Sequence, residues 1–455
     1  MNKNTSFYKS LKYSIYDGSA HAVMVGAGES YLMAYVVALG FSNFAIGLTA
    51  SIPLLIAACS QLYIVNRAGD ITSRRFFIVR LALLQGAMWI PLMVLPALLP
   101  AYRVSVVVLL LILYHSCIHL ATPVWNSWMA DLVDPAKRGD YFGTRNKYRA
   151  LSEVIAYLIC GFILQFMSTD DSLDGFYIIF CVAFAARGVS ALFLHKIEEP
   201  TYQRPQAEDQ FTFLEFLKKA PHNNFGRFVL FNFCLIAGSF LASPFFTAYM
   251  LKTLHFSYIE LVAIYATCLV FQFFFYHSWG IIADRYGNIR VLKVTALGLS
   301  VIPVLWVLTR NFWCIIFFQF LAGVTWSGYL LTSSNFIYDA VSQKRLQRCV
   351  AYFNFMGNFA IFIGALCGGA ITRIYDFFLG DLCHMMPQGF VYYLLFTLSS
   401  VLRLLAVVFF AERLKDVRPV QQGSLFKLLG DFMTVSLTFE SGGRRRPQQQ
   451  DDLKK

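Results

Sequence analysis

Apolar runs of about twenty residues recur along almost the whole chain, separated by short polar connections. A helix rises about 1.5 Å per residue and the hydrocarbon core of a bilayer is about 30 Å thick, so each run is long enough to cross a membrane once. Inside lipid, backbone groups must be satisfied within the crossing segment, which favours helices throughout. The sequence therefore predicts an all-α membrane protein.

The apolar runs predict twelve spans in two sets of six. The first set covers Ile15–Gly40, Phe44–Val65, Phe76–Leu99, Val104–Trp128, Tyr148–Met167 and Gly175–His195. The second set covers Gly226–Leu251, Tyr258–Ile282, Ile289–Leu308, Phe312–Ile337, Ala351–Ile374 and Gly389–Ala411. We therefore expect an N-terminal bundle over residues 1–195, a cytoplasmic linker over 196–225, a C-terminal bundle over 226–411 and a cytoplasmic tail over 412–455.

The linker and the tail each contain a short amphipathic pattern. Phe211–Leu217 mixes aromatic and aliphatic residues with charges, which predicts a short helix on the membrane surface. A second surface helix is expected near Leu425–Leu437. The basic and Gln-rich end of the tail is polar enough to predict disorder.

The composition favours a bilayer over water as the solvent. Hydrophobic residues make up 57% of the chain and charged residues 14%, against about 25% charged residues in a typical soluble domain. The net charge of +12 resides in short connections, most of it on one side, so it indicates topology and no nucleic-acid partner. With an even number of spans, both termini are expected in the cytoplasm. We expect a monomer in a bacterial inner membrane.

Matching motifs mark the two halves as similar. The fourth span ends with Asn126 and Asp131, and the tenth span ends with Asn335 and Asp339. The loop after the eighth span carries the pattern Gly280-x-x-Ala283-Asp284-Arg285-x-Gly287-x-x-Arg290, which resembles the signature loop of the major facilitator superfamily. The segment from Trp125 to Arg145 also resembles a bacterial branch of it, of unassigned substrate. The resemblance implies two pseudo-symmetric six-helix bundles around a central cavity.

The resemblance also implies a cytoplasmic gate at this loop. Asp284 would face the start of the fifth span near Tyr148, while Arg285 and Arg290 would pair with carboxylates across the loop and latch the two halves. Gly287 would supply the tight turn. The copy of the loop in the first half is shown by Asn66, Arg67 and Gly69. It carries Asn66 where the family usually has Asp, so its latch is expected to be weaker. The alternative is that these charges serve only as topological anchors.

Ionisable residues inside the first span predict proton coupling. Glu29 lies deep in the span, and a buried carboxyl there is costly unless it has a function. His21 and Asp17 fall on roughly the same helical face, so the three form a candidate proton ladder. The alternative is that Glu29 pairs with a buried cation such as Arg187 or Arg403. Glu153, near a cytoplasmic end, is expected to be an ordinary interface group.

The resemblance implies that the first, fourth, seventh and tenth spans line the cavity. Aromatic and amide side chains on these spans suit a mixed organic solute. Arg187, in the sixth span, would favour an anionic substrate if it faced the cavity. The candidate residues are Trp125, Asn126, Asn232, Trp326, Tyr329, Asn335 and Arg187.

The sequence lacks a phosphate loop, a metal-protease motif and a nucleophile elbow, so we expect no enzyme activity. No cofactor is expected. The cysteines form no C-x-x-C pair, and the cluster at Cys383–Met386 is too isolated to predict a metal site. The first span lacks a convincing cleavage site and is expected to remain as an anchor.

We therefore predict a secondary transporter that moves a small organic solute by alternating access, coupled to protons. The alternatives are a facilitative uniporter and a non-transporting receptor or assembly partner. A membrane enzyme acting on lipid-linked substrates would need a catalytic cluster at one interface, which the sequence lacks.

Overall fold

The computed structural model describes residues 3–67, 71–133, 138–167, 173–200, 212–341, 343–379, 389–410, 412–417 and 425–440. The N-terminal half contains α1 (Lys3–Ala27), α2 (Leu32–Ala38), α3 (Asn43–Arg67), α4 (Arg74–Ala87), α5 (Trp89–Leu98), α6 (Arg103–Leu132), α7 (Arg138–Met167) and α8 (Asp174–His195). The C-terminal half contains α10 (Asn224–Ala248), α11 (Tyr258–Tyr286), α12 (Asn288–Leu308), α13 (Phe312–Ala340), α14 (Gln343–Leu379) and α15 (Phe390–Phe410). The linker and tail contribute α9 (Phe213–Lys219) and α16 (Leu425–Glu440).

Within the described residues, eleven helical segments are long and apolar enough to cross a membrane, with α4 and α5 counted as one. The predicted first span is not among them because it is interrupted. It consists of α1, a single 3₁₀ turn at Glu29–Tyr31 and the short α2. The expectation of one continuous helix over Ile15–Gly40 is therefore wrong. The segment still runs through the N-terminal bundle, where α1 packs against α7 and α8.

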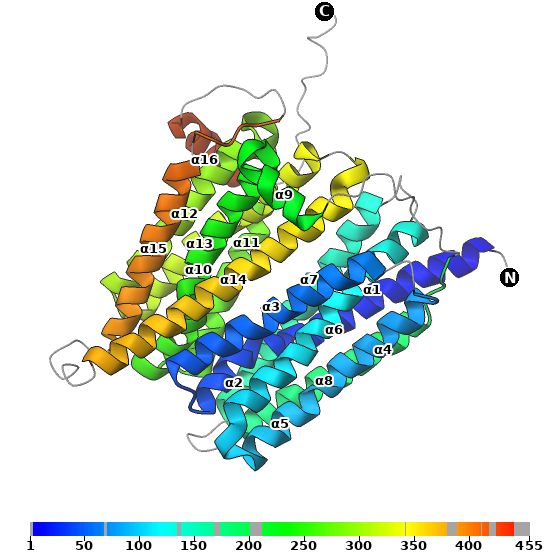
Figure 1. Ribbon diagram of the computed structural model, residues 1–455, viewed down its shortest axis with the longest axis horizontal. Helices are drawn as coiled ribbons and strands as arrows, with labels where there is room; N and C mark the ends of the chain where they lie inside the picture. Colours follow the sequence, from blue (N-terminus) through cyan, green and yellow to red (C-terminus); the bar gives the residue numbers. More distant parts are fainter. Residues whose placement is uncertain are drawn as a thin grey trace, which may run out of the picture.

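The two halves form separate bundles that meet along α3 and α14 (Figure 1). A matching contact repeats in each half. Asp131 at the end of α6 pairs with Arg74 of α4 at 2.6 Å, and Asp339 at the end of α13 accepts a hydrogen bond from Asn288 of α12 at 2.9 Å. The sequence repeat therefore corresponds to a structural repeat.

Hydrogen bonds join the two halves at one end of the molecule. The N-terminus and helices α9 and α16 lie at the opposite end. At the joined end, Lys252 Nζ donates to the Phe41 carbonyl at 2.7 Å, and the Tyr392 hydroxyl donates to Asn43 Oδ1 at 3.0 Å. Gly47 lets the backbones of α3 and α14 approach closely, because a Cβ at this position would lie 2.7 Å from the Ala365 carbonyl oxygen.

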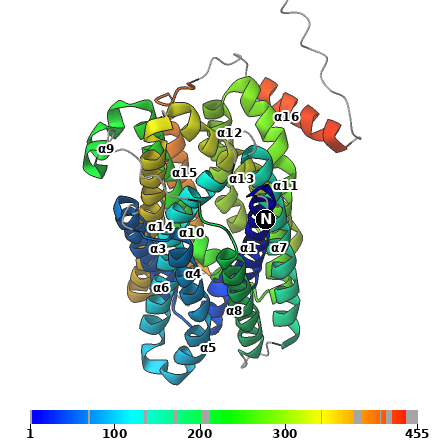
Figure 2. The same cartoon turned by 90° about the vertical axis from the view of Figure 1, so that its right-hand side faces the viewer.

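Both predicted amphipathic helices are present, but each packs against the C-terminal half. Thr212 and Glu215 form a capping box at the start of α9, and the Phe213 ring packs edge-on against Tyr352. In α16, Leu428 is fully buried and the Phe432 ring stacks on Trp279 with centroids 4.0 Å apart. Figure 2 shows α9 and α16 at the same end of the molecule. The residues predicted to be disordered lie outside the described part.

Glu199, just after α8, caps the start of α4. Its carboxylate accepts hydrogen bonds from Ser73 Oγ at 2.6 Å and from the Arg74 amide at 2.7 Å. Partial burial acts to raise the Glu199 pKa, but these hydrogen bonds and the Arg74 charge outweigh it, so the pKa lies below its ordinary value. A carboxylate at a helix N-terminus also compensates the helix dipole.

Glu199→Gln is expected to lower the free energy of unfolding by about 1 kcal/mol at neutral pH. A lowered folded-state pKa stabilises the protein above the unfolded pKa, near 4.5, and this contribution is lost as the pH falls through the folded value. Thermal unfolding in detergent should therefore show a deficit that shrinks on acidification. A deficit that is constant with pH would contradict this role.

Candidate functional site

The first transmembrane segment breaks where it reaches the centre of the molecule. Helix α1 ends at Ala27, and Gly28 packs closely against the Trp89 ring, where a Cβ would come within 2.5 Å of a ring carbon. Only glycine fits here, and glycine also weakens the helix. The chain then makes the single 3₁₀ turn that begins with Glu29.

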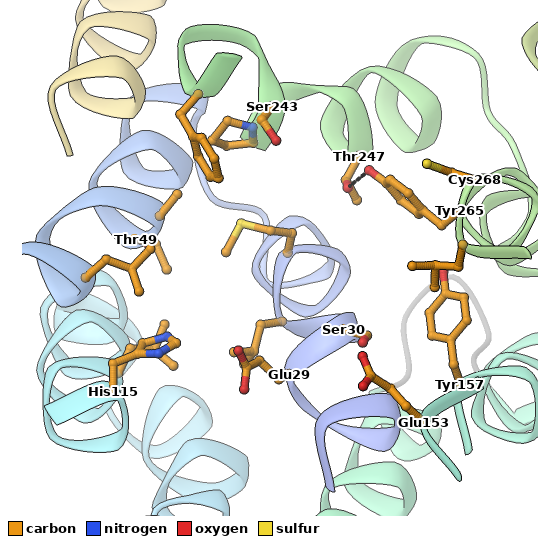
Figure 3. A pocket seen from close by; sticks show the side chains of 18 residues that line it. Glu29, Ser30, Thr49, His115, Glu153, Tyr157, Ser243, Thr247, Tyr265 and Cys268 are labelled. Atoms are coloured by element: carbon orange, nitrogen blue, oxygen red, sulfur yellow. Dashed lines mark hydrogen bonds between the residues drawn. The ribbon is translucent and has the colours of Figure 1, made fainter. Parts of the chain in front are cut away.

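A cavity of about 440 Å³, with Glu29 in its lining, lies between the two halves. Figure 3 shows Glu29, Ser30 and Glu153 together on one side of it, with Thr247 and Tyr265 on the other. Glu29 Oε2 accepts a hydrogen bond from the Tyr114 hydroxyl at 2.9 Å. A carboxylate on a central cavity that both halves line is able to exchange a proton with the cavity.

A second cavity, of about 450 Å³, lies within the N-terminal half and carries most of the site's charge. Asp17 Oδ1 accepts a hydrogen bond from Ser190 at 2.7 Å, and Asp17 Oδ2 pairs with Arg145 at 3.5 Å. The remaining polar and aromatic lining residues are His21, Thr122, Trp125, Asn126, Phe142, Asn146, Arg149 and Arg187.

The three residues of the predicted proton ladder divide between these cavities. Asp17 and His21 line the second cavity, whereas Glu29 lines the first. The interruption at Gly28 separates them, because the face of α1 does not continue through the 3₁₀ turn. Glu29 is thus the member of the set that faces both halves.

Neither of the two buried arginines proposed as an ion-pair partner of Glu29 makes a hydrogen bond to it. Arg187 Nε donates to Gln85 Oε1 at 2.9 Å and its Nη1 donates to Ser190 Oγ at 2.7 Å. Arg403 is buried within the C-terminal half, where its Nη1 donates to the Leu299 carbonyl at 2.8 Å. Arg187 lines the second cavity, as an anion-binding role would require.

A third cavity, of about 520 Å³, lies mainly against the C-terminal half. The Tyr329 hydroxyl donates to Asn232 Oδ1 at 2.6 Å, so both predicted residues lie at this cavity. Trp125 and Asn126 line the second cavity, while Trp326 and Asn335 line none of the three. Trp326 instead packs edge-on against Tyr329.

Sequence reasoning missed several cavity residues. Glu153 lies on the central cavity, so the expectation of an ordinary interface group is wrong. Arg145, Arg149 and Glu153 recur every four residues along one face of α7, and this spacing in a span was the signal available. The two missed amides of the third cavity, Asn354 and Asn358, had no comparable signal. The missed residues are His115, Arg145, Arg149, Glu153, Asn354 and Asn358.

The predicted gate motif contacts the C-terminal tail. Arg285 Nη1 pairs with Asp431 of α16 at 2.7 Å, and the Tyr286 hydroxyl donates to the same carboxylate at 2.7 Å. The carboxylate partner of Arg285 therefore comes from the tail and not from across the loop. Asp284 is exposed at the end of α11.

Other motif residues shape the turn between α11 and α12. Gly287 has φ of +93°, which requires glycine, and the Ile289 amide donates to Asp416 Oδ1 at 2.8 Å. Gly280 lies on α11 near Leu331, and the Arg290 charge acts on Asp416. In the first half, Arg67 is exposed at the end of α3. The side chain of Asn66, and Gly69, lie outside the described residues.

Asp431→Asn is expected to weaken the docking of α16 on α11, because it removes the charge that Arg285 and Tyr286 share. An exposed pair of this kind contributes about 0.2–1 kcal/mol, so detachment should be partial. Limited proteolysis of the full chain should cut the tail faster in this variant. Asp451→Asn, a charge removal elsewhere in the tail, is the control, and equal cutting rates in both variants would contradict the assignment.

Comparisons with known proteins agree with this architecture. A family model described as the Major Facilitator Superfamily matches residues 228–439. The nucleoside transporter NupG, in a mutant form, superposes with a TM-score of 0.68 at 14% identity, over 89% of this chain and 100% of that one. The C-terminal half therefore matches the superfamily model, and the whole chain shares the fold of these transporters. The resemblance found in the signature loop is thereby confirmed, and the protein is an integral multi-pass membrane protein.

Two further similarities are informative. A bacterial homologue of the iron transporter ferroportin, in an inward-facing state, superposes with a TM-score of 0.65 at 15% identity, over 90% of this chain and 99% of that one. The efflux pump azaK of Aspergillus niger is 34% identical over 95 residues, which is 21% of this chain. That match spans 20% of the length of the pump. At these identities the structural superpositions establish the fold of this chain and not its substrate.

Proposed function

We propose that the protein is a secondary transporter that moves a small organic solute by alternating access and is coupled to protons through Glu29. The observation that carries this proposal is the position of the Glu29 carboxylate at a helix break on the central cavity. Intramembrane carboxyls that face a cavity are costly and typically serve ion or proton pathways. Broken helices at the midplane are a recurrent device for such sites.

The arrangement of the halves supports alternating access. The hydrogen bonds from Lys252 and Tyr392 join the halves at one end, while the second and third cavities lie nearer the end that carries α9 and α16. Small residues at the α3–α14 contact allow close packing that a rocking motion would open and close. By the charge asymmetry of the loops, the end with the cavities would face the cytoplasm.

Flux measurements in proteoliposomes test the proposal. Ligands are first selected by thermal stabilisation of the purified protein, and uptake of a selected radiolabelled ligand is then measured with and without a pH gradient. Accumulation above the external concentration only with the gradient would support proton coupling. Flux that merely equilibrates would indicate a uniporter, and binding without any flux would indicate a receptor.

A further inference from the structure

Among the described residues, every charged side chain that lines the three cavities belongs to the N-terminal half. Three are arginines and three are carboxylates: Arg145, Arg149, Arg187, Asp17, Glu29 and Glu153. The described C-terminal lining of the third cavity offers amides and hydroxyls instead, among them Asn232, Asn354, Asn358, Tyr329 and Ser333. A ligand that spans the site would therefore meet charge on one side and neutral hydrogen-bonding groups on the other.

The net charge of the residues that line the cavities depends on whether Glu29 is protonated. With all three carboxyls ionised, the arginines are balanced one for one. When Glu29 takes up a proton, one positive charge is left without a counter-charge. A net charge in a cavity surrounded by lipid and protein is unfavourable unless an opposite charge joins it. Protonation of Glu29 therefore favours the binding of a ligand that carries a single negative charge.

The contacts identify which arginine is available to a ligand. Arg145 pairs with Asp17 at 3.5 Å and stacks on Trp125 at 4.3 Å, and the two hydrogen bonds of Arg187 described above hold it in place. Within the described part of the chain, the one ion pair of Arg149 is a long contact to Glu153, at 3.9 Å, and its side chain is 44% exposed at the second cavity. A guanidinium offers several parallel donors, which suit a carboxylate or phosphate group.

We propose that the substrate is an organic monoanion whose charged group binds Arg149, and that it is carried together with the proton on Glu29, so that a transport cycle moves no net charge. This inference rests on the proposed function and specifies its substrate class. The uncharged part of the substrate would contact the amides and hydroxyls of the C-terminal half, so a hydroxylated or otherwise polar body fits. Binding to both halves is also what alternating access needs from a substrate.

Other titratable groups surround Glu29 and enter the expected pH dependence. Histidines at the cavities count as neutral in the charge balance, and a second proton on one of them would add to the attraction for an anion. The groups facing Glu29 or the second cavity are Tyr114, His115, Arg149, Glu153, Tyr157, Arg187, Tyr265, Cys268, Asp17, His21 and Arg145. Variants of Glu29 and Arg149 must therefore be compared at the same pH.

Matched ligand series provide a binding test on the purified full chain. The gluconate, sorbitol and glucamine series and the benzoate, benzyl alcohol and benzylamine series each differ mainly in charge. We expect thermal stabilisation by the anion of at least one series, stronger in acid than at neutral pH. Arg149→Gln should weaken that binding by about tenfold to hundredfold, and Arg149→Lys should restore part of it. The control Lys147→Gln removes a charge from the same helix at a residue that lines none of the three cavities.

Three binding results would overturn the proposal. They are stabilisation by the cation or the neutral member alone, full anion binding in Arg149→Gln, and no stabilisation by any member. For the stabilising anion, uptake into proteoliposomes should respond to a pH gradient and be insensitive to a potassium diffusion potential set with valinomycin. Uptake driven by the potential would also overturn the electroneutral cycle. Proton-coupled uptake of a cation would leave the proposed function intact and reject only this inference.

Discussion

Glu29→Gln is expected to abolish accumulation of solute against its concentration gradient while leaving counterflow exchange intact. Glutamine preserves the size of the side chain and its ability to accept from Tyr114, but it cannot bind and release a proton. Loss of the coupling ion site removes the free energy that the pH gradient supplies, without removing the solute site. The measurement is uptake into proteoliposomes with an imposed pH gradient, compared with exchange at equal pH on both sides.

Asp376→Asn is the matched control for this prediction. Asp376 is a carboxylate on α14, within a membrane-crossing segment, and it lines none of the three cavities. Its loss should leave both accumulation and exchange near the wild-type level. If Glu29→Gln still accumulated solute to the wild-type extent, the coupling role of Glu29 would be rejected. If exchange were lost as well, Glu29 would have to be assigned to the solute site.

Gly47→Val is expected to reduce transport by about fivefold to hundredfold, because it prevents the halves from closing at the end where Lys252 and Tyr392 join them. The added side chain would begin 2.7 Å from the Ala365 carbonyl oxygen, and a backbone atom cannot turn aside as a flexible side chain can. Overpacking of this kind costs about 1–3 kcal/mol, and each ~1.4 kcal/mol shifts a conformational equilibrium tenfold. The measurement is transport by the variant together with the solvent accessibility of cysteines at this end of the molecule. Both quantities should change in Gly47→Val.

Gly188→Val tests whether the position or the residue type causes the effect. Gly188 lies in α8, and a Cβ there meets nothing within 4 Å. A valine at this position should leave transport nearly unchanged, apart from a small change in helix propensity. Equal losses in both variants would show that valine harms any span, and a fully active Gly47→Val would show that close packing of α3 on α14 is dispensable.

Much of the architecture could be predicted because the bilayer imposes a simple rule on composition. The spans, the two halves and both amphipathic helices follow from runs of apolar residues and their interruptions. The helix ends were less predictable, since α7 begins at Arg138 and α14 at Gln343, well before their apolar runs. Outside the hydrocarbon, a helix continues as long as its polar residues have helix propensity, and hydropathy carries no information about that.

The residues of the candidate site likewise divide into those that the sequence could predict and those that it could not. Glu29 stood out in the sequence because a charge in an apolar run is conspicuous, and Asn232 and Tyr329 followed from the spans implied by the family resemblance. Glu153 and Arg149 did not stand out, since they lie near the polar start of α7, where charges are common. Their importance depends on the cavity that α7 faces, which is a property of helix packing.

The sequence by itself determined that lipid surrounds the chain, how many times it crosses, and which intramembrane residue is costly enough to need a function. Each of these depends on the local free energy of transfer from water to hydrocarbon, which can be read from consecutive residues. Only the tertiary structure decided that the first span breaks at Gly28, that Arg285 pairs with Asp431, and that three arginines and three carboxylates line two of the cavities. These features arise from steric and electrostatic contacts between segments far apart in the chain, such as Trp89 against Gly28.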